Sequence, residues 1–187
     1  MTVVFADLSG YTALSERLDP EELRGVVTRV LTEASGSIVS FGGHVEKLLG
    51  DAVMAVFGMQ QASEDDPVRA ILAAFELHER VASLEVSPLP AGALTMHTAV
   101  TTGVVVTSDG GQGREVVGDA VNVAARLATF AGPGEIVADH ETYQMACGHV
   151  EAVSLGGVEV RGRAEPVRAY RLIAPRHLPV KVRGLGR

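Results

Sequence analysis

The sequence predicts an α+β protein in which a ferredoxin-like βαββαβ core carries a mainly antiparallel sheet. Residues 2–6 form an apolar run that is typical of a buried strand. Two further apolar runs flank Gly50-Asp51, and Gly and Asp tolerate the tight turn of a β-hairpin. Helical periodicity appears before and after this hairpin, and another strand-like run follows. This order predicts helices packed on a sheet, and 187 residues suffice for one core.

The helix that precedes the hairpin begins at Asp19-Pro20. Asp is a preferred N-cap, Pro suits the first helical turn, and Glu22 completes the spacing of a capping box. Apolar residues then recur at helical spacing until Gly42-Gly43 ends the helix. The hairpin itself spans residues 43–58, and a second helix begins at Asp66-Pro67.

The second half of the chain predicts shorter elements. Residues 94–107 are rich in β-branched side chains but contain Gly103, which indicates a strand with a bend or bulge. Asp109-Gly110-Gly111 predicts a hairpin turn, and the apolar neighbours of Cys147 predict a buried thiol. The other predicted elements are helices at 119–131 and 141–146 and strands at 114–117, 135–138, 149–154, 158–160 and 167–172.

Composition and charge narrow the classes of function. The formal net charge of −7 disfavours a nucleic-acid partner, because phosphate binding needs a basic surface. No apolar run reaches the roughly 20 residues of a membrane span, and no signal-peptide pattern is visible, so we expect a cytoplasmic protein without membrane contact in this segment. Eight basic but two acidic residues follow Gly156. We interpret 1–174 as the domain and 175–187 as a basic linker or tail leading to a further domain, with an interaction arm as the alternative.

Two aspartates follow strand-like runs and suggest a metal site. Asp7 comes directly after residues 2–6, and Asp51 lies in the hairpin turn. If the first strand lies beside the hairpin, both carboxylates emerge at one edge of the sheet. Two carboxylates with open water positions suit Mg²⁺ or Mn²⁺, particularly when phosphates complete the coordination. The alternative is a pair of aspartates that only cap turns.

Three segments together resemble class III adenylate and guanylate cyclases. Residues 5–12 (Phe-Ala-Asp-Leu-Ser-Gly-Tyr-Thr) and 46–51 (Glu-Lys-Leu-Leu-Gly-Asp) are similar to the two metal-site motifs of that family. Residues 117–127 (Val-Gly-Asp-Ala-Val-Asn-Val-Ala-Ala-Arg-Leu) are similar to its catalytic helix. The resemblance implies the class III nucleotide cyclase fold and a homodimer whose active sites are shared between subunits. It also implies fusion to regulatory domains in a longer protein.

The resemblance implies adenylate cyclase chemistry, in which the ribose 3′-hydroxyl of ATP attacks the α-phosphate to give 3′,5′-cyclic AMP and pyrophosphate. Two Mg²⁺ or Mn²⁺ ions would serve this in-line displacement. By resemblance, Asp7 and Asp51 bind the metals and the backbone carbonyl of Leu8 adds an oxygen. Asn122 orients the ribose and Arg126 stabilises charge on the α-phosphate. These two residues are four apart and so share a helix face, which without the resemblance would be plain solvated surface.

The same resemblance implies that substrate choice depends on Lys47 and Glu115. Lys47 lies where adenylate cyclases of the family carry Lys and guanylate cyclases typically Glu. Lysine only donates hydrogen bonds, which suits the N1 acceptor of adenine and repels the N1–H of guanine. Glu115 occupies the partner position, where Asp or Thr is usual, and it can accept from the 6-amino group. Arg161-Gly162-Arg163 stands where the family has a phosphate-binding Lys-Gly-Lys. We assign the phosphate contact to Arg161. The alternative is that both arginines only lie on a solvated strand.

Other functions remain open at the level of sequence. The first is a catalytically weak or inactive cyclase-like domain that binds ATP and serves as a sensor or dimerisation module. Glu115 and the arginine-for-lysine changes at 161–163 favour it, and the other catalytic positions disfavour it. The second is a guanylate cyclase, which Lys47 disfavours. The third is a ferredoxin-like RNA-binding domain, which the acidity and the 4% aromatic content disfavour.

Overall fold

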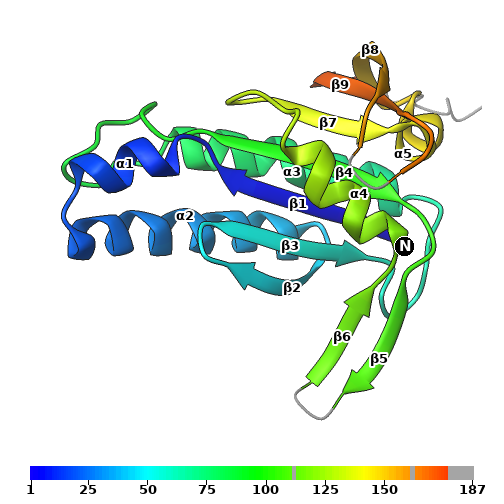
Figure 1. The fold of residues 1–187 in the computed structure, drawn as a ribbon, viewed down its shortest axis with the longest axis horizontal. Coiled ribbons are helices and arrows are strands. Elements are labelled where there is room, and N and C mark those ends of the chain that lie inside the picture. The colour runs from blue at the N-terminus through cyan, green and yellow to red at the C-terminus, as the bar shows by residue number, and fades with distance from the viewer. Residues whose placement is uncertain (111–112, 161–162, 177–187) are drawn as a thin grey trace, which may run out of the picture.

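A seven-stranded sheet forms the centre of the computed structural model, which describes residues 1–110, 113–160 and 163–176. Its strands, in spatial order, are β2 (His44–Leu49), β3 (Ala52–Phe57), β1 (Thr2–Leu8), β4 (Met96–Thr102), β7 (Ile136–Asp139), β9 (Val167–Pro175) and β8 (Val150–Val158). Neighbouring strands are antiparallel except β4 and β7, which are parallel. The predicted α+β fold with a mainly antiparallel sheet is confirmed (Figure 1).

Five helices and a separate ribbon surround this sheet in the described part of the chain. The helices are α1 (Tyr11–Arg17), α2 (Pro20–Ser40), α3 (Asp66–Ala82), α4 (Asp119–Ala128) and α5 (His140–Ala146). Strands β5 (Val106–Gly110) and β6 (Gly113–Val117) pair with each other and project away from the sheet as a ribbon (Figure 1). Within the residues that the structure describes, no helix has both the length and the apolar character needed to cross a membrane.

Alternation along β1 divides the core between the two faces of the sheet. Val4, Ala6 and Leu8 belong to the main core, in which α2 and α3 pack on one face. Val3 points to the opposite face and packs with Ala120 of α4. Because successive side chains of a strand point to opposite faces, α4 covers the face that α2 and α3 leave open. Figure 1 shows α4 crossing this face over the half of the sheet that holds the beginning of β1.

The predicted beginning and end of the long helix are confirmed in detail. The Asp19 carboxylate accepts hydrogen bonds from the backbone N–H groups of Glu21 (2.9 Å) and Glu22 (2.8 Å), and Glu22 accepts from the Asp19 N–H at 3.2 Å. This is the capping box that the spacing predicted. At the other end, a Cβ atom on Gly43 would lie 2.6 Å from the Phe57 ring and 2.7 Å from Ile38. Glycine there lets the backbone pack closely against Phe57 and Ile38 between α2 and β2.

Three predictions are wrong in their bounds or burial. The helix predicted at 119–131 ends at Ala128. The strands predicted at 149–154 and 158–160 are one strand, β8, which stays paired with β9 through register shifts near Glu151 and Gly156. Gly156 has φ +73°, a conformation that accommodates such an irregularity. Cys147 is exposed, because it follows the last turn of α5, where Ala146 points into the core. Most of the predicted basic tail, residues 177–187, lies outside the described residues.

His78 of α3 predicts a pH-dependent stability. Its Nε2 lies 2.8 Å from Thr98 Oγ1, and burial lowers the pKa of His78 from 6.5 to about 4, with the charge of His97 adding to the effect and a hydrogen bond to the Gly134 backbone opposing it. Between these values the unfolded chain binds a proton that the folded chain does not. The free energy of unfolding should therefore fall by up to about 3 kcal/mol as the pH drops from about 6.5 to about 4.

Urea unfolding at several pH values measures this effect. His78→Gln, which keeps an N–H near Thr98, should flatten the pH dependence in that interval. His149→Gln, a change at an exposed histidine, should leave it as in the unmodified chain. Equal slopes for His78→Gln and the unmodified chain would assign the acid sensitivity to other groups.

Candidate active site

Asp7 and Asp51 meet at one edge of the sheet. Strand β1 pairs with β3 so that Asp7 lies opposite Ala52, next to the β2–β3 turn that carries Asp51. The backbone carbonyl of Asp51 accepts a hydrogen bond from the Leu8 N–H at 3.3 Å. Gly50 makes the tight turn possible with φ +67°. The position of β1 beside the hairpin is therefore confirmed, and both acids are partly exposed there.

The two carboxylates influence each other's ionisation. Burial raises the pKa of Asp51, and the charge of Asp7 and a hydrogen bond with its side chain raise it further. A backbone hydrogen bond and the charge of His97 act in the opposite direction. Ionising both carboxylates of a hydrogen-bonded pair costs free energy, because the two negative charges repel each other. A bound cation offsets this repulsion.

The donor set fits a hard divalent cation that keeps open positions. Asp7 and Asp51 supply carboxylate oxygens, and Leu8 supplies a backbone carbonyl from the same strand end. Within the described ranges, three or more His, Cys, Asp or Glu side chains do not gather in a way that could hold a metal alone. Mg²⁺ and Mn²⁺ sites commonly use one or two carboxylates, with water and substrate phosphates filling the remaining positions.

Sequence reasoning missed one neighbour of Asp7, His97. His97 of β4 lies directly opposite Asp7 in the β1–β4 register, and its Nε2 is 3.7 Å from Asp7 Oδ2. The Nδ1 of the same ring lies 3.0 Å from Ser9 Oγ. The local sequence around His97 resembles an ordinary strand, so the pairing register alone reveals this contact.

Asn122 and Arg126 share one face of α4, as their spacing predicted. Asn122 is exposed and Arg126 is half-buried. Val123 and Leu127, which follow them in sequence, are buried. The helix begins near the end of β4, where the Thr101 hydroxyl donates to the carbonyl of Ala120 at 2.8 Å. This is the end of the sheet where β1 begins, whereas Asp7 and Asp51 lie where β1 ends (Figure 1). One chain therefore does not bring these two pairs of residues together.

Lys47 lies on the same face of the sheet as α4. It is exposed on β2 and lies opposite Met54 in the β2–β3 register, and Met54 packs with Ala120 and Ala124 of α4. Directly opposed residues of antiparallel strands project to the same side. Glu115 lies on β6, where its backbone pairs with Ser108. Arg161 lies outside the described residues.

Comparison with known proteins identifies the family. The sequence profile for "Adenylate and Guanylate cyclase catalytic domain" matches residues 1–174. The chain belongs to this family. Uncharacterized protein Rv2212 of Mycobacterium tuberculosis is 30% identical to the cyclase domain over 90% of this chain and 40% of its own length. The chain therefore spans less than half the length of this relative.

Solved structures confirm the class III cyclase fold. The adenylyl cyclase CyaB of P. aeruginosa has a TM-score of 0.81 at 27% identity, covering 94% of both chains. The guanylyl cyclase Cya2 has a TM-score of 0.80 at 26% identity, covering 96% of this chain and 94% of its own. An adenylyl cyclase and a guanylyl cyclase are thus almost equally similar to this cyclase domain.

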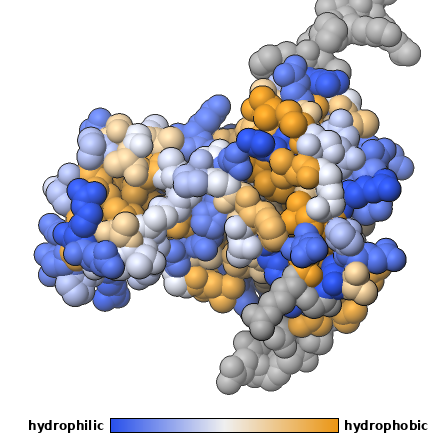
Figure 2. Space-filling view, turned by 45° about the horizontal axis from the view of Figure 1, so that its top comes forward, coloured by the Kyte–Doolittle hydropathy of each residue, from blue (hydrophilic) through white to orange (hydrophobic). Residues whose placement is uncertain are grey.

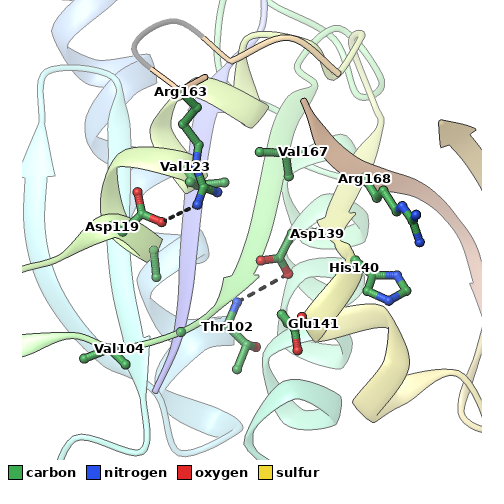
Figure 3. Close-up of a pocket in the computed structure, with 12 residues that line it drawn as sticks. Thr102, Val104, Asp119, Val123, Asp139, His140, Glu141, Arg163, Val167 and Arg168 are labelled. Carbon is green, nitrogen blue, oxygen red and sulfur yellow. Dashed lines mark hydrogen bonds and ion pairs between the residues drawn. The ribbon is translucent and has the colours of Figure 1, made fainter. Parts of the chain in front are cut away.

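Arg163 of the cyclase domain lines a cavity beside α4. Its Nη2 lies 3.0 Å from Asp119 Oδ2, so this arginine is paired with the first residue of α4 (Figure 3). The cavity has a volume of about 520 Å³ and extends to the buried carboxyl of Asp139, whose pKa is raised by burial. Asp139 accepts from the Thr142 N–H at 3.0 Å and so caps α5. The cavity adjoins the side of α4 that carries Asp119 and Val123 (Figure 3). It lies beside Thr102, at the opposite end of the β1–β4 pairing from Asp7.

Proposed function

We propose that the cyclase domain is an adenylate cyclase that converts ATP to 3′,5′-cyclic AMP and pyrophosphate. The observation that carries this proposal is the meeting of Asp7 and Asp51 at one sheet edge, where their mutual repulsion favours a bound cation. Class III cyclase domains generally use divalent metals, and we assign two Mg²⁺ or Mn²⁺ ions to these acids and the Leu8 carbonyl. When bound, the ions supply activation of the 3′-hydroxyl and charge neutralisation on the departing phosphates.

The chain's own residues orient the nucleotide and stabilise developing charge. Asn122 is exposed on α4 and can donate to the ribose from there. Arg126, one turn later, directs a guanidinium at the α-phosphate, where its planar fork can donate to two oxygens and remains charged. Arg161 contacts the β- and γ-phosphates in this proposal. The pairing of Arg163 with Asp119 supports giving that role to Arg161.

A second copy of the chain completes the site. Asp7 and Asp51 lie at one end of β1, and α4 with Asn122 and Arg126 lies toward the other, so a homodimer would join the acids of one subunit to the helix of its partner. Exposed apolar residues support such contact: Leu48 and Leu49 on β2 and Val106 and Val117 on the ribbon are each about half exposed or more. Figure 2 shows the larger apolar areas in the right half of the face in view, the half that holds α4 in Figure 1.

The proposal also covers the domain boundaries of the protein. We assign the catalytic domain to residues 1–174 and a basic linker to 175–187, which leads to a further regulatory domain in a cytoplasmic protein. The greater length of Rv2212 supports additional domains.

The direct test incubates the purified chain with Mn²⁺ and either ATP or GTP and measures the cyclic product. Cyclic AMP formation that depends on Mn²⁺ or Mg²⁺ is expected. ATP binding without any product would favour the sensor alternative that Glu115 raised, and cyclic GTP as the main product would make the domain a guanylate cyclase.

Lys47 predicts the base preference within that assay. Its ammonium can donate to N1 of adenine but opposes the N1–H of guanine, and Glu115 can accept from the 6-amino group. Lys47→Glu should therefore shift the ratio of kcat/KM for ATP over GTP toward GTP by about one to two orders of magnitude, since one mismatched hydrogen bond costs about 1–3 kcal/mol. His44→Glu, on the same strand and also exposed, is the matched control and should leave the ratio unchanged. An unmodified chain that prefers GTP would contradict this assignment of Lys47.

A further inference from the structure

Ser9, His97 and Asp7 form a continuous chain of polar contacts at the edge where the metal is assigned. Asp7 and His97 are directly opposed across β1 and β4, so their side chains project to the same face. The distance from His97 Nε2 to Asp7 Oδ2 is 3.7 Å, and that from His97 Nδ1 to Ser9 Oγ is 3.0 Å. Both ring nitrogens thus have polar neighbours, and only 20% of the His97 side chain is exposed.

The surroundings of the ring select one tautomer of His97. An ionised Asp7 carboxylate accepts hydrogen bonds and does not donate them, so the Nε2 that faces it is better protonated. The Nδ1 then carries a lone pair and accepts from the Ser9 hydroxyl, which can rotate to donate. An imidazole N–H directed toward Asp7 stabilises the carboxylate and fixes the orientation of the ring beside it.

The Asp7 carboxylate is consequently held from two sides. The Leu8 N–H donates to Oδ1 at 3.0 Å, and the His97 N–H faces Oδ2. At 3.7 Å the second contact is longer than a hydrogen bond, so its effect is electrostatic and orienting. It opposes the electrostatic repulsion between Asp7 and Asp51.

We propose that His97, with its ring oriented by Ser9, is a positioning residue for Asp7 and thereby raises the affinity of the site for divalent metal. The inference rests on the proposed function, because Asp7 is assigned there as a metal ligand. An outer partner of a metal ligand usually changes affinity by about 10–100-fold when it is removed.

The experiment measures binding of Mn²⁺ alone to the whole chain by electron paramagnetic resonance, which counts the free ion. His97→Phe keeps a ring of similar size but removes both nitrogens, and it should weaken Mn²⁺ binding by about tenfold or more. His97→Gln keeps an N–H within reach of Asp7 and should stay within about threefold of the unmodified chain, as the conservative replacement of a donor. His149→Phe, at an exposed histidine, is the matched control and should change nothing.

Ser9→Ala tests the same proposal through a smaller change. It removes one hydroxyl from a partly exposed residue and should weaken Mn²⁺ binding by about threefold, the size of one neutral hydrogen bond of roughly 0.7 kcal/mol. Combined with His97→Phe it should add nothing further, because Ser9 acts through the ring. In the cyclase assay, His97→Phe should raise the Mn²⁺ concentration needed for half-maximal rate and leave kcat at saturating Mn²⁺ close to normal.

The outcomes separate this inference from the proposed function. Failure of the unmodified chain to bind Mn²⁺ would contradict the metal site itself. Normal Mn²⁺ binding by the unmodified chain and equal binding by His97→Phe, or by Ser9→Ala if the former does not fold, would overturn the positioning role. An electron spin-echo signal from nitrogen bonded directly to Mn²⁺, lost in His97→Gln, would make His97 a ligand and would also overturn it.

Discussion

Asp51→Ala is expected to abolish cyclic AMP formation while the protein stays folded. Asp51 is assigned to the metal site, and loss even of an outer partner of a metal ligand costs about 10–100-fold, so loss of the ligand should cost at least about 100-fold. The fold should tolerate the change, because Asp51 lies in a turn and its ionisation is already opposed by burial and by Asp7. Removing it relieves that opposition and creates no cavity in the core.

Rates of product formation and thermal unfolding followed by circular dichroism measure the two halves of this prediction. Asp7→Ala should have the same phenotype. Asp65→Ala is the control, since it removes an exposed aspartate near the other end of β3 and should retain full activity. Near-normal cyclic AMP formation by Asp51→Ala would remove that residue from the metal site.

Mixing two inactive variants is expected to restore activity. In the proposed homodimer each site takes Asp51 from one subunit and Arg126 from the other. Homodimers of Asp51→Ala or of Arg126→Ala therefore contain two damaged sites. A mixed dimer collects both changes in one site and leaves the other intact. Random exchange in an equal mixture makes about half the dimers mixed, so activity should reach roughly a quarter of the unmodified level at equal total protein.

Subunit exchange has to be verified, for example by co-purification of differently tagged chains. Mixing Asp51→Ala with Asp7→Ala is the control. Both acids of a site come from the same subunit in the proposed dimer, so each site of a mixed dimer still lacks one of its two acids and should stay inactive. Verified mixed dimers of Asp51→Ala and Arg126→Ala that stay inactive would contradict independent sites shared between subunits.

Local chemistry explains why most of the fold could be predicted from the sequence. The capping box at Asp19, the glycines after α2 and the Gly50-Asp51 turn act within a few residues of themselves. Apolar periodicity likewise reports directly which face of a helix or strand is buried. The meeting of Asp7 and Asp51 needed one long-range assumption, that β1 lies beside the hairpin, and the register between Asp7 and Ala52 bears it out.

Features that depend on distant partners could not be predicted in the same way. The continuity of β8 depends on its pairing with β9, because residues 156–157 would end an isolated strand. The exposure of Cys147 depends on where α5 ends against the core, and apolar neighbours in sequence do not report that. Arg163 pairs with Asp119, more than forty residues earlier in the chain.

The sequence by itself determined the residues that carry the proposed chemistry and the elements that hold them, because motifs, caps and turns are encoded over short spans. Only the tertiary structure decided that His97 lies opposite Asp7, and that α4 lies away from the acids of its own chain. Both facts follow from strand order and register. Register is determined by the summed burial of side chains across a whole sheet, and a shift of one residue would turn every side chain of a strand to its other face.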